Sequence, residues 1–261
     1  GRPSVAINLK DPRGVEVVLD LVERADILIE GLRPGVTERL GVGPEQCFAR
    51  NPRLVYGRMT GWGQDGPLAQ SAGHDINYIS VAGALDTIGR AGGPPQIPLN
   101  LLGDFAGGSM YLVTGVLSAL IHARAGGGGQ IVDAAITDGV AHLLAMPLMM
   151  QQVGSWTHER GTNLLDSGAP FYDVYETADG EWVSIGSIEP QFFAQLLELT
   201  EIEHDDLPHQ MDRSGWPLLR ERLSACIKAR TRAEWTDEIA GTDMCFAPVL
   251  PMSEAKQHPH L

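Results

Sequence analysis

Two short segments rich in glycine each place an ionisable side chain within otherwise apolar sequence. His74 lies in the segment 73–78 (GHDINY), and Asp104 lies in the segment 102–108 (LGDFAGG). An imidazole can accept a proton near neutral pH, and a carboxyl group can return one. If the two side chains face each other across a cleft, they form a pair of bases that removes and replaces a proton on carbon.

Each of these residues also has an ordinary interpretation. Asp104 stands where the N-cap of an apolar helix is expected, so its carboxylate could simply accept a backbone N–H. The same helix start could leave the N–H groups of residues 105–108 free to stabilise an oxyanion. A helix N-terminus favours an ionised carboxylate, so proton donation by Asp104 needs burial to oppose that effect. His74 alone is consistent with a loop histidine, and Asp75 with a solvated carboxylate.

The elements that precede these segments alternate between strands and helices, which is typical of a parallel α/β sheet covered on both faces. Residues Val15, Val18, Leu19 and Val22 are spaced as on one face of a helix that begins after Asp11. The expected strands are 5–9, 26–30 and 54–59, and the expected further helices are 34–40 and 44–50, each with proline near its first turn.

The middle of the chain combines irregular and strongly apolar sequence. Residues 61–98 are rich in glycine and proline and are expected to be largely irregular. The helix expected at 110–121 is apolar on nearly every side, which predicts a fully buried position. The glycines at 126–129 predict a flexible turn into a strand at 130–134, although such a run could also cradle a phosphate. A further helix is expected at 137–153.

The pattern of expected elements changes in the carboxy-terminal part of the sequence and predicts a second, smaller α+β domain. Strands at 171–176 and 182–185 flank Asp179-Gly180, a strong hairpin signal. Helices at about 190–200, 216–229 and 232–240 follow, and then a strand at 246–250. The predicted boundaries are 1–135 for the large domain, 136–166 for a linker helix and loop, 167–251 for the small domain, and 252–261 for the start of a return segment.

Composition narrows the possible partners and compartment. The net charge of −14 argues against nucleic acid, whose phosphates need a basic surface. Residues 1–60 nevertheless hold nine Lys and Arg against eight Asp and Glu, so this part could receive an anion, unless the uneven distribution is accidental. Three scattered cysteines suit a reducing cytoplasm and offer no metal-ligand spacing. The sequence shows no run of 18 apolar residues, so no membrane association is expected.

The glycines at 61, 63 and 66 match the G-x-G-x-x-G pattern of dinucleotide-binding sites. Such a fingerprint should open a long helix, whereas Pro67 and a polar loop follow here. Nicotinamide or flavin binding is therefore disfavoured.

Taken together, several segments resemble the family III CoA-transferase superfamily and, within it, the α-methylacyl-CoA racemases. The resemblance covers essentially the whole chain. Its segments are 25–30, 33–36, 58–64, 66–67, 73–78, 103–105, 129–135, 168–172 and 188–192. Relative to the family pattern, the sequence begins within the second strand unit, without the opening strand and helix, and stops before the carboxy-terminal return segment.

The resemblance implies a Rossmann-like large domain, a linker, a small α+β domain and a homodimer of interlocked chains. It assigns His74 and Asp104 to an acid/base pair and Glu189 to a third active-site acid from the small domain of the other subunit. Glu189 alone would read as a favourable charge at a helix start. The positions that it assigns to coenzyme A are Ile7, Asn8, Leu9, Lys10, Gly31, Leu32, Arg33, Arg39, Gly73, His74, Asp75, Ile76, Asn77 and Tyr78.

Within this resemblance, the histidine separates two activities. The transferases use the aspartate to form an acyl anhydride and usually carry an aromatic residue where this chain has His74. The expected activity is therefore racemisation of 2-methylacyl-CoA thioesters in lipid and fatty acid metabolism, with no metal and no cofactor beyond the coenzyme A of the substrate. A transferase with Asp104 as nucleophile and a non-catalytic CoA-binding module remain alternatives. Met146, Met149 and Met150 could offer an adaptable surface for acyl tails or form ordinary core.

Overall fold

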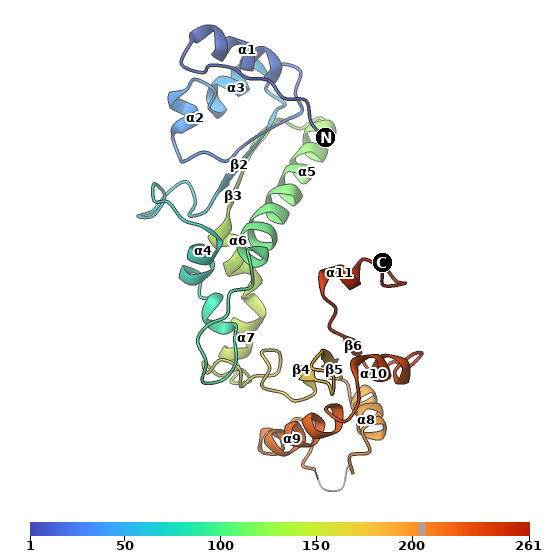
Figure 1. Cartoon of the computed structure of the whole chain (residues 1–261). Coiled ribbons are helices and arrows are strands. Elements are labelled where there is room, and N and C mark those ends of the chain that lie inside the picture. Colours follow the sequence, from blue (N-terminus) through green and yellow to red (C-terminus); the bar gives the residue numbers. More distant parts are fainter. Residues whose placement is uncertain (204–206) are drawn as a thin grey trace. The chain divides into compact units, whose positions relative to one another are not determined.

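The computed structural model describes residues 1–203 and 207–261 and divides into two compact units (Figure 1). Unit 1 comprises residues 1–86 and 96–150, and unit 2 comprises residues 87–95 and 151–261. The chain thus changes unit near residue 150, within the segment 136–166 that the sequence marked as a linker. Residues 87–95 group with unit 2, which the sequence did not indicate because this short segment has no apolar periodicity.

Unit 1 is built on a parallel sheet, as predicted. Its strands are β1 (Ile27–Glu30), β2 (Val55–Thr60) and β3 (Gln130–Ala135), in the order β1-β2-β3. β2 lies in the centre and is buried along almost its whole length, which explains its near-continuous apolar sequence. The strand predicted at 5–9 is wrong: residues 1–8 carry no regular secondary structure and add no strand to this sheet.

Helices cover both faces of this sheet. The helices α1 (Pro12–Val22), α2 (Val36–Arg39) and α3 (Pro44–Arg50) follow the prediction closely. Asp11 caps α1 by accepting the Arg13 N–H at 3.0 Å. Alternate residues of β2 point to opposite faces, so Tyr56 packs in a cluster with α1 and α3, whereas Val55 packs in a cluster with α5 (Met110–Arg124).

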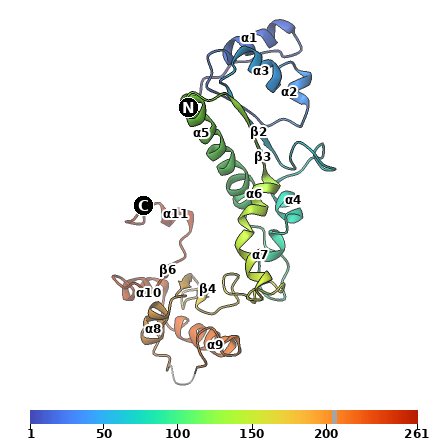
Figure 2. The ribbon, with the colours of Figure 1, turned by 180° about the vertical axis from the view of Figure 1, so that it is seen from behind.

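The long apolar helix differs from expectation at its start and in its burial. It begins as a π-helix, η2 (Leu101–Ser109), and continues directly as α5. Figures 1 and 2 show α5 running alongside β2 and β3, against which it buries Leu112 and Val116. The opposite face is exposed, with Ile121 70% accessible. The prediction of burial on every side is therefore wrong, because a helix lying on a sheet buries only the face toward the sheet.

The combined helix Leu101–Arg124 has 24 residues and a mean hydropathy of 1.4 over its most apolar window. By length and composition alone, it could cross a membrane. A core helix of an ordinary domain can have the same length and composition, and in this unit one side of the helix packs against the sheet.

The segment 61–98 is largely irregular, as predicted, apart from α4 (Asp75–Val81) and a 3₁₀ turn at Leu85–Thr87. α4 has only seven residues, too few for a periodic apolar face. The helix predicted at 137–153 is two helices, α6 (Ile136–Leu143) and α7 (Ala145–Gln152). Pro147 explains the break, because it cannot donate to the carbonyl four residues earlier.

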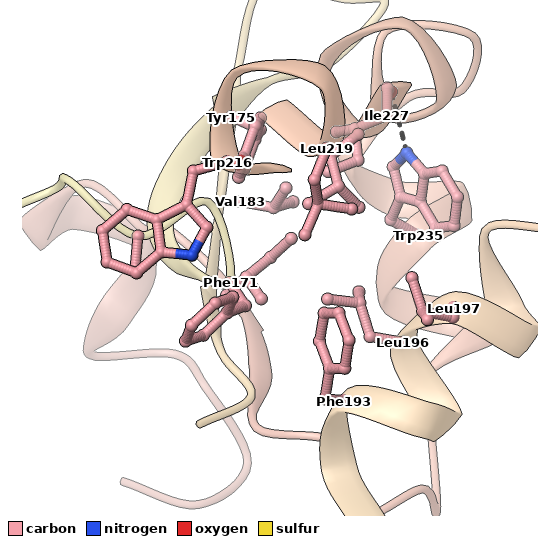
Figure 3. Packing of buried hydrophobic residues seen from close by; sticks show 13 residues of the cluster. Phe171, Tyr175, Val183, Phe193, Leu196, Leu197, Trp216, Leu219, Ile227 and Trp235 are labelled. Carbon is pink, nitrogen blue, oxygen red and sulfur yellow. Dashed lines mark hydrogen bonds between the residues drawn. The ribbon is translucent and has the colours of Figure 1, made fainter. Parts of the chain in front are cut away.

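Unit 2 combines an antiparallel sheet with helices, as the sequence predicts. A turn at Asp179-Gly180 joins its first two strands, with Gly180 at φ +79°. Figure 3 shows the core, a cluster that includes Phe171, Val183 and Trp235, in which the Trp235 Nε1 donates to the Ile227 carbonyl at 2.9 Å. The elements are β4 (Tyr172–Glu176), β5 (Trp182–Gly186), α8 (Pro190–Leu199), η4 (Arg213–Gly215), α9 (Trp216–Ile227), α10 (Arg232–Glu238), β6 (Phe246–Pro248) and α11 (Met252–Ala255).

Close approach of α6 to η2 depends on glycine. A Cβ at Gly139 would collide with the backbone carbonyl of Gly107, and a Cβ at Gly107 would lie 2.7 Å from a methyl group of Val140. We predict that Gly139→Ala lowers the free energy of unfolding by about 1 to 3 kcal/mol, because the two helices must separate. Urea denaturation measures this change. Gly128→Ala is the matched control, since a Cβ there meets nothing closer than 4.0 Å; an equal loss in both variants would contradict the packing argument.

Candidate functional site

A cavity of about 450 Å³ in unit 1 is lined by both His74 and Asp104. Its walls come from the segments that follow β1 and β2, from the loop before α4, and from η2. These are the carboxyl ends of parallel strands, where open α/β sheets commonly bind ligands. The lining residues are Gly31, Leu32, Arg33, Pro34, Met59, Thr60, Gly61, Trp62, Ala69, Ser71, Ala72, Gly73, His74, Tyr78, Asp104 and Ile136.

His74 occupies the N-cap position of α4, with an extended backbone at φ −129° and ψ 173°. Its backbone N–H donates to Asn77 Oδ1 at 3.0 Å, which fixes the entry into the helix. Tyr78, one turn later, donates its hydroxyl to the Gly73 carbonyl at 2.6 Å and packs edge-on against Trp62. A Cβ at Gly73 would lie 2.7 Å from the Tyr78 ring, so glycine must precede the histidine.

The pKa of the Tyr78 hydroxyl depends on two features of the cavity. Burial raises the pKa of its hydroxyl, and the nearby carboxylate of Asp104 raises this pKa further. Tyr78 therefore keeps its proton at neutral pH and continues to donate to Gly73.

Asp104 is not the N-cap of the helix, contrary to the sequence analysis. It is the fourth residue of η2, and the N-cap position belongs to Asn100, whose Nδ2 donates to Asp104 Oδ2 at 3.3 Å. In a π-helix each N–H bonds to the carbonyl five residues earlier, so with Asn100 as the N-cap the first helical bond is donated by Phe105, and only the N–H groups before Phe105 lack a partner within the helix. The oxyanion donors expected at 105–108 therefore do not lie among these N–H groups. The sequence did not predict that the helix begins at Leu101, because π-helices are rare and have no distinct sequence pattern.

Asp75 connects the segment that carries His74 to the helix that carries Asp104. Asp75 is only 4% accessible, and its side-chain Oδ2 accepts the backbone N–H of Asp104 at 2.7 Å. A Cβ at Gly103 would lie 2.6 Å from this oxygen, so glycine is required there too. The hydrogen bond joins α4, which begins directly after His74, to the helix that carries Asp104. The resemblance placed Asp75 among the coenzyme A contacts; in the structure Asp75 is buried and is not part of the cavity lining.

A buried ion-pair network supports the wall opposite. Arg58 on β2 donates Nε to Glu30 at 2.9 Å and Nη1 to Glu38 at 2.8 Å. The other carboxylate oxygen of Glu30 accepts the Leu32 N–H at 2.8 Å, which fixes the turn Gly31–Arg33 that lines the cavity. Burial tends to raise the pKa of Glu38, but hydrogen bonds from Arg58 and others outweigh it, and the pKa lies below its usual value.

The remaining predicted coenzyme A positions do not line this cavity. Lys10 lies in an exposed turn where its backbone N–H donates to Asn8 Oδ1 at 3.1 Å. Arg39 ends α2, with its guanidinium beside Gly35. Glu189 occupies the N-cap position of α8 and belongs to unit 2. The other predicted positions outside the lining are Ile7, Asn8, Leu9, Ile76 and Asn77.

Two other sequence features can be placed. The glycines at 61–66 form turns, with Gly63 and Gly66 at positive φ, and no helix begins between these glycines and Asp75. This geometry lacks the helix start of a dinucleotide fingerprint.

In α7, Met146 and Met149 are about half exposed, so the ordinary-core interpretation of these methionines is wrong. Among residues 1–203 and 207–261, no three His, Cys, Asp or Glu side chains gather as metal ligands would.

With this geometry in place, comparison with known proteins gives consistent results. The CoA-transferase family III model matches residues 1–261. The chain is 44% identical over 260 residues to the α-methylacyl-CoA racemase of Mus musculus and 43% identical over 260 residues to that of Homo sapiens, covering 100% of this chain and 68% of each relative. A crystal structure of a CaiB/BaiF family protein from Brucella suis superposes with a TM-score of 0.80 at 25% identity, covering 98% of this chain and 68% of that one. The chain belongs to CoA-transferase family III.

The Asp75 contact can be tested directly. We predict that Asp75→Ala accelerates amide hydrogen exchange at Asp104 at least tenfold, because the N–H loses an acceptor worth about 1.5 to 3 kcal/mol. Asp75→Asn retains a carboxamide oxygen and should restore most of the protection. Exchange resolved by mass spectrometry or NMR measures both, and Asp65→Ala, on the exposed loop, is the control. Unchanged exchange in Asp75→Ala would contradict the assignment.

The Glu38 contact predicts a pH effect of defined sign. Because the folded pKa is lowered, this group stabilises the fold above its unfolded pKa and loses that contribution as pH falls through the folded pKa. We predict that Glu38→Gln and Arg58→Met each flatten the decline in unfolding free energy between about pH 5 and pH 3, by no more than about 1 kcal/mol since Glu38 is partly exposed. Urea unfolding at several pH values measures the slope. A wild-type slope in both variants would refute this role.

Proposed function

We propose that this enzyme interconverts the (R) and (S) forms of 2-methyl-branched acyl-CoA thioesters by moving the α-proton. The observation that carries the proposal is the presence of His74 and Asp104 in the lining of one cavity at the carboxyl ends of a parallel sheet. The similarity to racemases of mouse and human along the whole chain supports the same reaction.

In this mechanism, neutral His74 removes the α-proton from one face of the substrate. The electron pair of the broken C–H bond moves toward the thioester oxygen and gives a planar enolate. Protonated Asp104 then delivers its proton to the opposite face of the same carbon. In the reverse direction the two residues exchange roles. The Asn100 amide, which contacts Asp104 Oδ2, orients this carboxyl group. The N–H groups of residues 101–103, which precede Asp104 in the first turn of η2, are candidates to stabilise the enolate oxygen.

The substrate would be positioned mainly through its coenzyme A portion. Arg33 supplies a cation in the cavity lining, and Lys10 and Arg39 are proposed to contact the nucleotide outside it. Binding energy from this remote, polyanionic part would hold the α-carbon between the two bases. No separate cofactor is required. The exposed methionines Met146 and Met149 would offer adaptable contacts to varied acyl tails.

We also propose that the chain acts in the cytoplasm as a homodimer of interlocked subunits, in which Glu189 of the other subunit completes the site. The apolar face of α5 supports an additional contact, because Val113, Leu117 and Ile121 leave an exposed stripe that water disfavours. The net charge of −14 supports the absence of nucleic acid among its partners.

The main alternative is a CoA-transferase that uses Asp104 as a nucleophile. Such a reaction does not require a second base, yet His74 lines the same cavity as Asp104. The carboxyl group could be trapped as an acyl adduct with hydroxylamine in the presence of an acceptor acid. That adduct would favour the transferase, and tight coenzyme A binding without proton exchange would favour a non-catalytic module.

The two-base mechanism predicts an asymmetric loss of exchange. In heavy water, the enzyme should introduce deuterium at the α-carbon of both enantiomers of 2-methylacyl-CoA. His74→Ala should suppress exchange from one enantiomer about 100-fold or more, and Asp104→Asn should suppress exchange from the other, because each removes the base on one face. Mass spectrometry of the thioesters measures the rates.

His122→Ala removes an exposed histidine outside the cavity lining and should retain wild-type exchange. Equal loss from both enantiomers in His74→Ala would contradict the assignment of one base to each face.

A further inference from the structure

Unit 2 contains a second cavity, of about 570 Å³, that the proposed reaction does not use. Three arginines from three different segments contribute to its lining. Arg90 lies in the short segment 87–95, Arg213 in η4 and Arg220 in α9. Trp216, which is 7% accessible, also contributes to the lining, and the cavity volume falls within the range of about 300 to 1,000 Å³ typical of small-molecule sites.

Two of these arginines are fixed by one buried carboxylate. Arg90 Nη1 contacts Asp173 Oδ1 at 2.5 Å, and Arg220 Nη1 contacts the other oxygen of the same group. The Asp173 side chain is 2% accessible, so its position is well constrained. Arg220 also donates Nη2 to the carbonyls of Ser167 and Gly168. One carboxylate neutralises only one of the two guanidinium groups, so a positive charge remains.

Arg213 adds a positive charge that has no carboxylate partner among the described residues. Its guanidinium lies 5.5 Å from the centre of the Trp216 ring and donates Nη2 to the Ser155 carbonyl at 2.9 Å. Trp216 is itself held by a 2.9 Å hydrogen bond from Nε1 to the Gln210 carbonyl. Among residues 1–203 and 207–261, no carboxylate forms an ion pair with Arg213. These contacts orient the guanidinium without neutralising it.

The charge of this cavity contrasts with that of its unit. Unit 2 carries 19 acidic and nine basic residues, yet three of the nine basic residues line this single cavity. Glu159 is the acidic residue of the lining, and with Asp173 it balances two of the three arginines. Like charges concentrated in a cleft repel one another and raise the local concentration of anions. Ion pairs with a buried carboxylate account for Arg90 and Arg220, whereas the contacts of Arg213 within the described residues leave its charge without a carboxylate partner.

We propose that this cavity binds a small anion that carries carboxylate or phosphate groups, with Arg213 and Arg90 as its donors. Arginine forms charge-assisted hydrogen bonds to both kinds of group, and the fixed positions of these two side chains reduce the entropy lost on binding. Trp216 would contact the apolar part of such a ligand.

The test is calorimetric titration of the full chain with inorganic pyrophosphate and with citrate. We expect saturable binding of at least one probe that weakens as salt concentration rises. Arg213→Ala should weaken it about tenfold or more, since the probe loses a charge-assisted hydrogen bond. Arg230→Ala is the matched control, because Arg230 also lies over a tryptophan ring, that of Trp235 at 4.9 Å, but outside the cavity lining.

The outcomes separate clearly. Binding of pyrophosphate alone identifies a phosphate ligand, binding of citrate alone identifies a carboxylate ligand, and either result supports the site when Arg213→Ala weakens it selectively. No saturable binding of either probe, or equal weakening in both variants, would overturn the proposal. Circular dichroism establishes that Arg213→Ala is folded, and Arg213→Lys, which keeps the charge, should retain part of the affinity. His74→Ala should bind both probes normally, so the result does not depend on the proposed racemase activity.

Discussion

The hydrogen bond from the Asp104 amide to the buried carboxylate of Asp75 is the constraint on which the candidate active site depends. It sets the start of the π-helix against the helix that follows His74. The glycine at 103 makes this contact possible, because a Cβ there would come within 2.6 Å of the carboxylate oxygen. The glycines around Asp104 are therefore required by close packing between helices. The position of Asp104 is set by the hydrogen bond of its own backbone N–H.

The opposite wall of the cavity is held by charge. Arg58 joins the ends of β1 and β2 to α2 through two glutamates, and one of them also fixes the turn that carries Arg33. A buried arginine of this kind adds little net stability, because desolvation offsets its attraction to the carboxylates. Its value is geometric, since it allows only one arrangement of the turn. The cavity thus combines one wall fixed by glycine packing with another fixed by a buried ion-pair network.

Much of unit 1 could be predicted because the pattern of apolar residues is local. Strands β1, β2 and β3 and helices α1 and α3 follow directly from such patterns. The glycine-rich surroundings of His74 and Asp104 marked both residues as candidates, the family resemblance implied that they act as a pair, and both line one cavity. The residues that support the site could not be found in the same way. Asp75 and Arg58 acquire their roles only when distant segments meet, and a single charged residue carries no periodic signal. The false strand at 5–9 had the correct residue types but gained no neighbouring strand.

The π-helix has a consequence for how the site can change during evolution. Successive residues of an α-helix are rotated by about 100° around the axis. Deletion of one residue between Phe105 and Ser109 would rotate everything before it by about that angle if the rest of the stretch kept its geometry, and Asp104 would then turn out of the cavity. A π-helical turn holds one residue more than an α-helical turn, so a stretch that tightened into ordinary α-helix at the same time would absorb the deletion and keep both flanks in register. The wide turns therefore let this stretch differ in length by one residue while Asp104 and α5 keep their orientations.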